Sequence, residues 1–261
     1  MKKIVGVLAL CFTAFAANAA VQGKEVSYQA NGVTLKGYVA YDDAVKGRRP
    51  AVLVVHEWWG HNNYVRHRAD MLAKLGYTAL AVDMYGDGKQ ANHPDDAGKF
   101  ATEVATNMPM AKARFEAGMD LLKKQKTVNG KKLAAIGYCF GGGVVLNMAR
   151  LGEDLKGVAS FHGALSSDIP VQPGTIKARI ISFTGEDDAM ITADKVAAFK
   201  LEMDAAKADY RVVTYPGVKH SFTNPEADEL GKKFSLPLAY NAAADKDSWQ
   251  QATVFLQEVF K

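Results

Sequence analysis

The sequence contains no apolar run of the roughly 20 residues that a membrane-spanning helix requires. The apolar stretch at residues 4–16 is too short to cross a bilayer comfortably, and no later segment approaches the required length. We therefore expect a mature protein that has no membrane partner.

The N-terminal segment instead has the order of a secretory signal peptide. Lys2 and Lys3 precede the apolar stretch, and the small residues at 17–19 follow it. We predict cleavage after residue 19 and export of a soluble protein, most simply to a bacterial periplasm. A lipoprotein signal at Cys11 is the alternative, which the bulky Leu10 before the cysteine disfavours.

Cysteine is scarce, since the 261 residues include only Cys11 and Cys139. Cleavage of the signal peptide would leave Cys139 alone and would exclude an intramolecular disulfide. An unpaired thiol is prone to oxidation in an oxidising compartment, so its presence favours a chemical role. The alternative is a buried free cysteine that packs as a small hydrophobic side chain.

Neither sign of charge dominates the chain. The 32 Lys and Arg against 28 Asp and Glu give a formal net charge of +4, and loss of Lys2 and Lys3 would lower it to +2 (4 − 2). A nucleic-acid partner would require a concentrated basic face, so we expect none. We interpret the lysine clusters at 123–126 and 131–132 as solvated charges.

Residues 20–261 contain no repeat, low-complexity tract or linker, and their length suits one large α/β domain. Asn31-Gly32 predicts a tight hairpin between residues 24–30 and 33–41. Short apolar runs then alternate with amphipathic stretches, which indicates a mostly parallel sheet with helices on both faces. We expect doubly buried strands at 51–55, 78–82, 133–136, 157–161, 179–183 and 211–215, and helices at 65–75, 111–124, 142–151, 193–206 and 247–260. Residues 86–110 are less regular and suggest a short helix and loop over the strand ends.

The strongest functional signal is the run Gly137-Tyr138-Cys139-Phe140-Gly141-Gly142. It follows a predicted strand and precedes a predicted helix, as a nucleophile elbow does, with Cys139 where serine is more usual. The glycines permit the close strand–helix approach that a Cβ would obstruct. We predict that Cys139 is a nucleophile.

A thiol attacks an acyl carbon as the thiolate, so it needs a base. His220, after the strand at 211–215, is the best candidate. In an α/β-hydrolase order the acid lies between nucleophile and base, which selects Asp188, with Asp187 as the alternative.

His56-Glu57-Trp58-Trp59-Gly60 follows a predicted strand, where a second oxyanion donor usually lies. We assign this role to the backbone N–H groups of Trp58 and Phe140. Glu57 would lie beside the thiol and could accept or relay a proton, or could be a polar residue at the strand end. We expect no metal, because His56, Glu57 and His61 lack a companion cysteine or a second pair of ligands.

The pocket walls are less well defined by the sequence. Trp58, Trp59, Tyr85 and Phe222 could line an apolar pocket or could be core residues. His162 follows the strand at 157–161 and lies at the same edge of the sheet. It could line the pocket or be a hydrogen-bonded structural histidine.

These motifs, with Gly185-Glu186-Asp187-Asp188 and His220-Ser221-Phe222, resemble the dienelactone hydrolase family over essentially the whole mature chain. The resemblance implies an α/β-hydrolase fold, a Cys-Asp-His triad, no cofactor, and hydrolysis of an enol-lactone or related ester. Matched by position, Cys139 is the nucleophile, Asp188 the orienting acid and His220 the base. The family's glutamate, here Glu57, is thought to hold the resting thiol and to take part in its activation.

The chain departs from the family where members that hydrolyse dienelactone carry two arginines for the substrate carboxylate. The matching stretches, residues 83–87 and 220–224, contain no arginine, and Asp87 would repel an anion. We therefore expect a small neutral or less acidic ester or lactone as substrate. A noncatalytic binding protein with Cys139 as a sensor thiol, and a peptidase with the same triad, are the alternatives.

Overall fold

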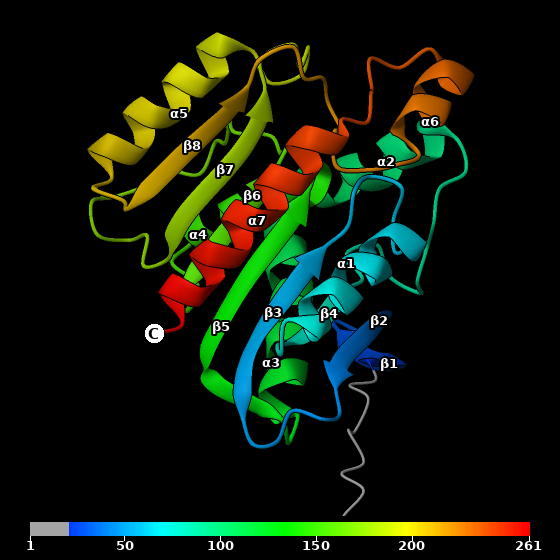
Figure 1. Ribbon diagram of the computed structural model, residues 1–261, viewed down its shortest axis with the longest axis vertical. Coiled ribbons are helices and arrows are strands. Elements are labelled where there is room, and N and C mark those ends of the chain that lie inside the picture. The colour runs from blue at the N-terminus through cyan, green and yellow to red at the C-terminus, as the bar shows by residue number, and fades with distance from the viewer. Residues whose placement is uncertain (1–20) are drawn as a thin grey trace, which may run out of the picture.

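A computed structural model describes residues 21–261, so the predicted signal peptide lies outside the described residues. The chain forms an eight-stranded sheet in the order β1-β2-β4-β3-β5-β6-β7-β8 (Figure 1). Its strands are β1 (Val21–Ala30), β2 (Val33–Asp42), β3 (Arg49–Val55), β4 (Thr78–Val82), β5 (Val128–Tyr138), β6 (Gly157–Phe161), β7 (Arg179–Gly185) and β8 (Tyr210–Tyr215). Strands β3 to β8 are mutually parallel.

The predicted hairpin is confirmed, with β1 antiparallel to β2 from the Ala30–Val33 pair outward. Asn31 and Gly32 both have positive φ, at 50° and 77°, as a type I′ turn requires. Strand β2 then pairs antiparallel with β4 and attaches the hairpin to the parallel sheet.

Seven helices are present among the described residues, and they cover both faces of the sheet. They are α1 (Asn63–Lys74), α2 (Pro94–Ala105), α3 (Met108–Lys124), α4 (Phe140–Arg150), α5 (Ala193–Ala205), α6 (Ala227–Phe234) and α7 (Ala242–Val259). Helices α1 and α7 pack on one face, whereas α3, α4 and α5 pack on the other (Figure 1). Between residues 21 and 261 no helix is long and apolar enough to span a bilayer.

Alternation along β5 divides the core into these two layers. Leu133 and Ala135 point to the layer that includes α3 and α4, while Ala134 and Ile136 point to the layer of α1 and α7. Strands β4 and β6 are wholly buried and β5 is buried from Leu133 to Tyr138, as predicted from their apolar runs.

Two element predictions need correction. Strand β8 is not buried on both faces, because it is an edge strand whose residues are partly or fully exposed. Helix α6 was not predicted, because it spans only 8 residues and buries only Ala227 and Gly231. The less regular segment at 86–110 contains the full helix α2 and the start of α3.

The turn from β5 into α4 depends on glycine at position 137. A Cβ built on Gly137 would lie 2.1 Å from the carbonyl oxygen of Gly141, so a side chain cannot fit without backbone movement. This close contact lets α4 begin immediately after Cys139 at the C-terminal end of β5.

We expect Gly137→Ala to lower the free energy of unfolding by more than about 2 kcal/mol, because the clash is with backbone. Gly98→Ala in α2 is the matched control, since no atom lies within 4 Å of its Cβ position. There the same change should stabilise the helix by about 0.5–1 kcal/mol. Urea unfolding measures both, and equal stability of the two variants would contradict this account of the turn.

Candidate active site

Cys139 occupies the turn between β5 and α4 in a strained backbone conformation. Its φ of 51° and ψ of −115° lie in a region that L residues rarely adopt. The backbone N–H of Cys139 is held by the carbonyl oxygen of Phe161 at 2.9 Å and by His162 Nδ1 at 3.1 Å. The side chain is only partly buried and reaches a cavity at the C-terminal edge of the sheet.

The structure brings Asp188 and His220 together from the loops after β7 and β8. His220 Nδ1 and Asp188 Oδ2 are 2.7 Å apart, and both side chains are buried. The other carboxylate oxygen of Asp188 accepts the N–H groups of Met190 and Ile191, which fixes its orientation. The alternative acid, Asp187, is exposed and has no such contact with the imidazole.

The electrostatics of His220 favour its charged form. Burial lowers the pKa of His220, but the Cys139 thiolate and then the hydrogen bond that His220 donates to Asp188 outweigh it and raise that pKa to about 10. Nε2 of His220 is buried and has no hydrogen-bond partner among residues 21–261, so the cysteine acts on it through charge at this geometry. An imidazolium here would in turn stabilise a thiolate.

Two residues that line the cavity carry backbone N–H groups without an acceptor in the described part of the chain. Trp58 N–H and Phe140 N–H donate to no other group, while the residues that carry them line the cavity beside Cys139. Phe140 is the first residue of α4, where N–H groups have no partner within the helix. The Trp58 carbonyl accepts a hydrogen bond from Tyr85 Oη at 3.0 Å. These N–H groups can receive an oxyanion.

Glu57 is buried, but its carboxylate contacts the residues after His220 rather than the thiol. Ser221 Oγ donates to Oε1 at 2.9 Å, and Asn224 Nδ2 donates to Oε2 at 2.7 Å. Burial raises the pKa of Glu57, although these two hydrogen bonds and the charge of His220 act to lower it. No hydrogen bond joins Glu57 to Cys139 in the described structure, so the place of Glu57 beside the thiol stays a prediction, while its two hydrogen bonds attach it to the loop that carries His220.

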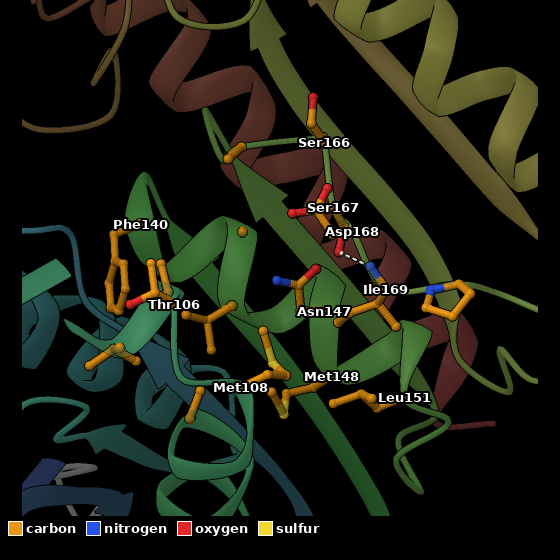
Figure 2. Close-up of a pocket in the computed structure, with 17 residues that line it drawn as sticks. Thr106, Met108, Phe140, Asn147, Met148, Leu151, Ser166, Ser167, Asp168 and Ile169 are labelled. Atoms are coloured by element: carbon orange, nitrogen blue, oxygen red, sulfur yellow. Dashed lines mark hydrogen bonds between the residues drawn. The ribbon is translucent and has the colours of Figure 1, made fainter. Parts of the chain in front are cut away.

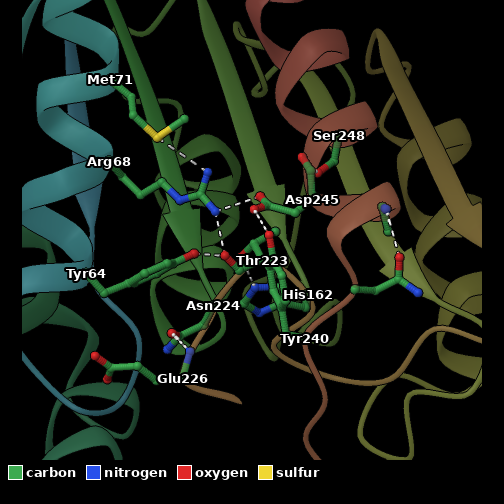
Figure 3. A network of polar contacts seen from close by, with 12 residues as sticks. Tyr64, Arg68, Met71, His162, Thr223, Asn224, Glu226, Tyr240, Asp245 and Ser248 are labelled. Carbon is green, nitrogen blue, oxygen red and sulfur yellow. Dashed lines mark hydrogen bonds and ion pairs between the residues drawn. The ribbon is translucent and has the colours of Figure 1, made fainter. Parts of the chain in front are cut away.

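His162 accepts the backbone N–H of Cys139 at Nδ1, and its ring also contacts Thr223 (Figure 3). Burial lowers the pKa of His162 well below its usual value, which keeps the ring neutral. With Nδ1 accepting the Cys139 N–H, Nε2 carries the proton and donates to Thr223 Oγ1 at 2.8 Å. Of the two predicted alternatives, the hydrogen-bonded structural histidine is therefore the one that the geometry shows.

A buried guanidinium holds Thr223, the residue that contacts His162, from helix α1. Arg68 on α1 donates to the carbonyl oxygen of Thr223 and to Asp245 on α7 (Figure 3). Tyr64 Oη lies 2.6 Å from Thr223 Oγ1. This network was not predicted, although the polar residues directly after His220 were a usable signal.

The cavity over Cys139 has a volume of about 240 Å³. Its walls are almost entirely apolar and are formed by Trp58, Ala101, Phe140, Ala164, Met190, Ile191 and Leu238, with Cys139 and His220 at its base. Helix α2 contributes to it through Ala101, as expected of the segment at 86–110.

Of the five residues considered as pocket walls, Trp58 lines this cavity, whereas Trp59, Tyr85, His162 and Phe222 are buried and do not line it. Trp59 packs with Phe234 of α6, while Phe222 and His162 stack edge to face within the core. Tyr85 contacts the rings of His56 and Phe140.

Both ring nitrogens of His56 are engaged with backbone groups rather than with other ionisable side chains. Nδ1 contacts the carbonyl oxygen of Glu57 at 2.6 Å, and Nε2 accepts the Met84 N–H at 3.3 Å. His61 Nε2 bonds to the carbonyl oxygen of Ala81. These contacts give His56 and His61 a structural role in the loops that surround the site.

Comparison with known proteins finds that the model of the dienelactone hydrolase family matches residues 35–260. Protein usf of Aquifex pyrophilus is 30% identical over 240 residues, covering 90% of this chain and 98% of its own. A putative carboxymethylenebutenolidase of Aquifex aeolicus is 29% identical over 244 residues, covering 92% and 100%. The solved structure of a dienelactone hydrolase-like promiscuous phosphotriesterase from metagenomic libraries is 30% identical, with a TM-score of 0.84 over 93% of this chain and 100% of its own.

We expect the imidazole of His220 to titrate near pH 10, and Cys139→Ala to lower that pKa by removing the thiolate charge. Because the pKa of folded His220 lies above the ordinary 6.5, protonation of His220 stabilises the folded state. This contribution to the free energy of unfolding is full below pH 6.5 and disappears as the pH rises through 10. NMR of the histidine rings against pH measures the shift. A His220 pKa that is unchanged in Cys139→Ala would contradict the coupling.

We expect Thr223→Val to leave His162 without its partner at Nε2, and so to loosen the backbone of Cys139. Unfolding should become easier by about 1–3 kcal/mol, and iodoacetamide should alkylate Cys139 more slowly. Thr253→Val, which removes one hydrogen bond in the distant α7, is the matched control for stability. Equal alkylation rates in the two variants would show that Thr223 does not position Cys139.

Proposed function

Because the chain belongs to the dienelactone hydrolase family and is an ester or lactone hydrolase, we propose that Cys139 is its nucleophile. The observation that carries this proposal is the convergence of three features on one cavity. These are the partly exposed Cys139, the buried pair of Asp188 and His220, and the two free N–H groups.

In the acylation step, the Cys139 thiolate attacks the carbonyl carbon, and the C=O electron pair moves onto oxygen. The N–H groups of Trp58 and Phe140 receive this oxyanion. As the carbonyl re-forms, the C–O bond to the leaving group breaks, and the His220 imidazolium gives its proton to the departing alkoxide. The products are an alcohol and a thioester on Cys139.

In the deacylation step, neutral His220 takes a proton from water as the water oxygen attacks the thioester carbon. The second oxyanion collapses, the C–S bond breaks, and the carboxylic acid leaves while Cys139 regains the thiolate. Asp188 keeps the proton on Nδ1 and stabilises the imidazolium in both steps. Glu57 acts by holding the loop that carries His220, and a direct proton relay from Glu57 to Cys139 stays a prediction.

The substrate we propose is neutral at the end that enters this cavity. The lining contains no arginine or lysine that could bind a carboxylate, and its walls are apolar. Asp87, which we expected to repel anions, is exposed and outside the lining, so the argument depends on the missing cations alone.

We propose further that the protein is exported, which is supported by the charged, apolar and small-residue order of residues 1–19. Mass spectrometry of the protein from a periplasmic fraction tests this. A mature N-terminus at Ala20 is the expected result, and an intact Met1 in the cytosol would contradict it.

The triad is tested by hydrolysis of a neutral aryl ester under reducing conditions. We expect Cys139→Ala and His220→Gln to lose at least about three orders of magnitude in kcat/KM, and Asp188→Asn on the order of two to four. The matched control is Asp187→Asn, which removes an exposed carboxylate one residue away and should leave activity unchanged. Full activity of Cys139→Ala would overturn the proposal.

The same assay tests the substrate by pairing a dienelactone that bears a carboxylate with its methyl ester. The methyl ester is expected to have the higher kcat/KM, because no arginine or lysine of the lining offsets the desolvation of a carboxylate, and the charge of His220 is already paired with Asp188 and Cys139. A strong preference for the free carboxylate would contradict a neutral substrate. A wild-type protein that hydrolyses nothing while its thiol reacts rapidly with peroxide would favour the sensor alternative.

A further inference from the structure

A second, larger hollow lies beside the cavity over Cys139. It has a volume of about 790 Å³ and runs along α4, opposite the junction of α2 and α3 (Figure 2). The loop at 164–170 forms its remaining wall. We refer to this hollow as the α4 groove.

The α4 groove adjoins the cavity over Cys139, because Phe140 and Ala164 line both. The cavity alone, at about 240 Å³, is smaller than the roughly 300–1,000 Å³ of ordinary ligand sites. A substrate that is cleaved at Cys139 and is longer than this cavity therefore has the groove as the neighbouring space, on the side of Phe140 and Ala164.

The chemistry of the groove suits an apolar chain. Val144 and Met148 of α4 line it together with Leu151, the residue after the helix. Met108, at the start of α3, lies across from Met148 (Figure 2). Methionine side chains adapt to irregular apolar ligands because they are unbranched and polarisable.

The polar groups of the groove already have partners or lie at its rim. Asn147 Oδ1 accepts a hydrogen bond from Arg150, and Ser167 Oγ accepts the Ile169 N–H. Asp168 is the charged residue of the lining and is exposed. The lining has no cation to bind an anionic tail, so the groove disfavours a second carboxylate or a phosphate.

We propose that the α4 groove binds an elongated, uncharged apolar arm of the ester that is cleaved at Cys139. This inference rests on the proposed function and names its substrate class: esters with a long aliphatic arm rather than compact lactones. The arm passes Phe140 and Ala164 and lies along α4. Asn147 follows Phe140 by seven residues, which places it about 10 Å farther along the helix axis.

Asn147→Phe tests the proposal, because the larger side chain narrows the groove at a position that a short substrate bound at Cys139 does not reach. The substrates are p-nitrophenyl acetate and p-nitrophenyl decanoate, with decyl acetate to ask whether the arm is the acyl or the alcohol part. We expect wild type to prefer one long ester over the acetate, and Asn147→Phe to lower kcat/KM for that ester by about tenfold or more. Activity on p-nitrophenyl acetate should stay unchanged.

Asn129→Phe is the matched control, since Asn129 is similarly half-buried but lies near the start of β5, outside the groove. Its ratio of long-ester to short-ester activity should equal that of wild type. Thermal unfolding checks that the variants fold, and Ser167→Phe on the opposite wall replaces Asn147→Phe if that variant does not. The replacement should cause the same selective loss.

The outcomes separate the two proposals. If Cys139→Ala abolishes acetate hydrolysis but chain length has no effect in wild type or in the groove variants, the proposed function stands and the groove inference is overturned. If wild type hydrolyses no ester of either length, the proposed function itself fails. A long-ester loss in Asn129→Phe equal to that in Asn147→Phe would also overturn the groove inference.

Discussion

The strained backbone of Cys139 is the constraint on which the site depends. A φ of 51° in a residue with a side chain costs on the order of 1–3 kcal/mol and persists only where surrounding contacts enforce it. Here the Cys139 N–H is held by Phe161 and His162, and Gly137 allows α4 to begin against the end of β5. The same turn leaves the N–H of Phe140, at the start of α4, without an acceptor among the described residues. The proposed nucleophile and a proposed oxyanion donor thus lie on one backbone distortion, and the core on both faces of β5 supports it.

The second requirement is the burial of ionisable groups in mostly apolar surroundings. Desolvation opposes charge on both Glu57 and His220, and specific partners offset it. The short segment from His220 to Asn224 carries several of these partners, since Ser221 and Asn224 hold Glu57 and Thr223 holds His162. Movement of this segment would disturb the base, the buried glutamate and the support of Cys139 together. The anchor from Arg68 and Asp245 therefore matters to the chemistry although it lies outside the cavity.

Most of the fold could be predicted from the sequence, because its strands are short apolar runs and its helices have clear apolar periodicity. The hairpin, the mostly parallel sheet and the coverage of both faces follow from those patterns, and β4 and β6 have the predicted bounds. The prediction failed where burial was asymmetric or slight, at the edge strand β8 and in the short charged helix α6. Trp59 and Phe222 were considered as pocket walls for a similar reason. Their aromatic side chains indicate burial, and both are buried, but residue type does not specify which cavity a ring faces.

By itself, the sequence determined the candidate triad, since Cys139, Asp188 and His220 each follow a strand of recognisable pattern and the chain order assigns their roles. It also determined the absence of the arginines that would bind a carboxylate, because that is a matter of residue identity. Only the tertiary structure decided that Glu57 is held by Ser221 and Asn224, that His162 supports the Cys139 backbone, and that the cavity adjoins the α4 groove. These features depend on contacts between segments far apart in the chain, and such contacts leave no local periodicity in the sequence.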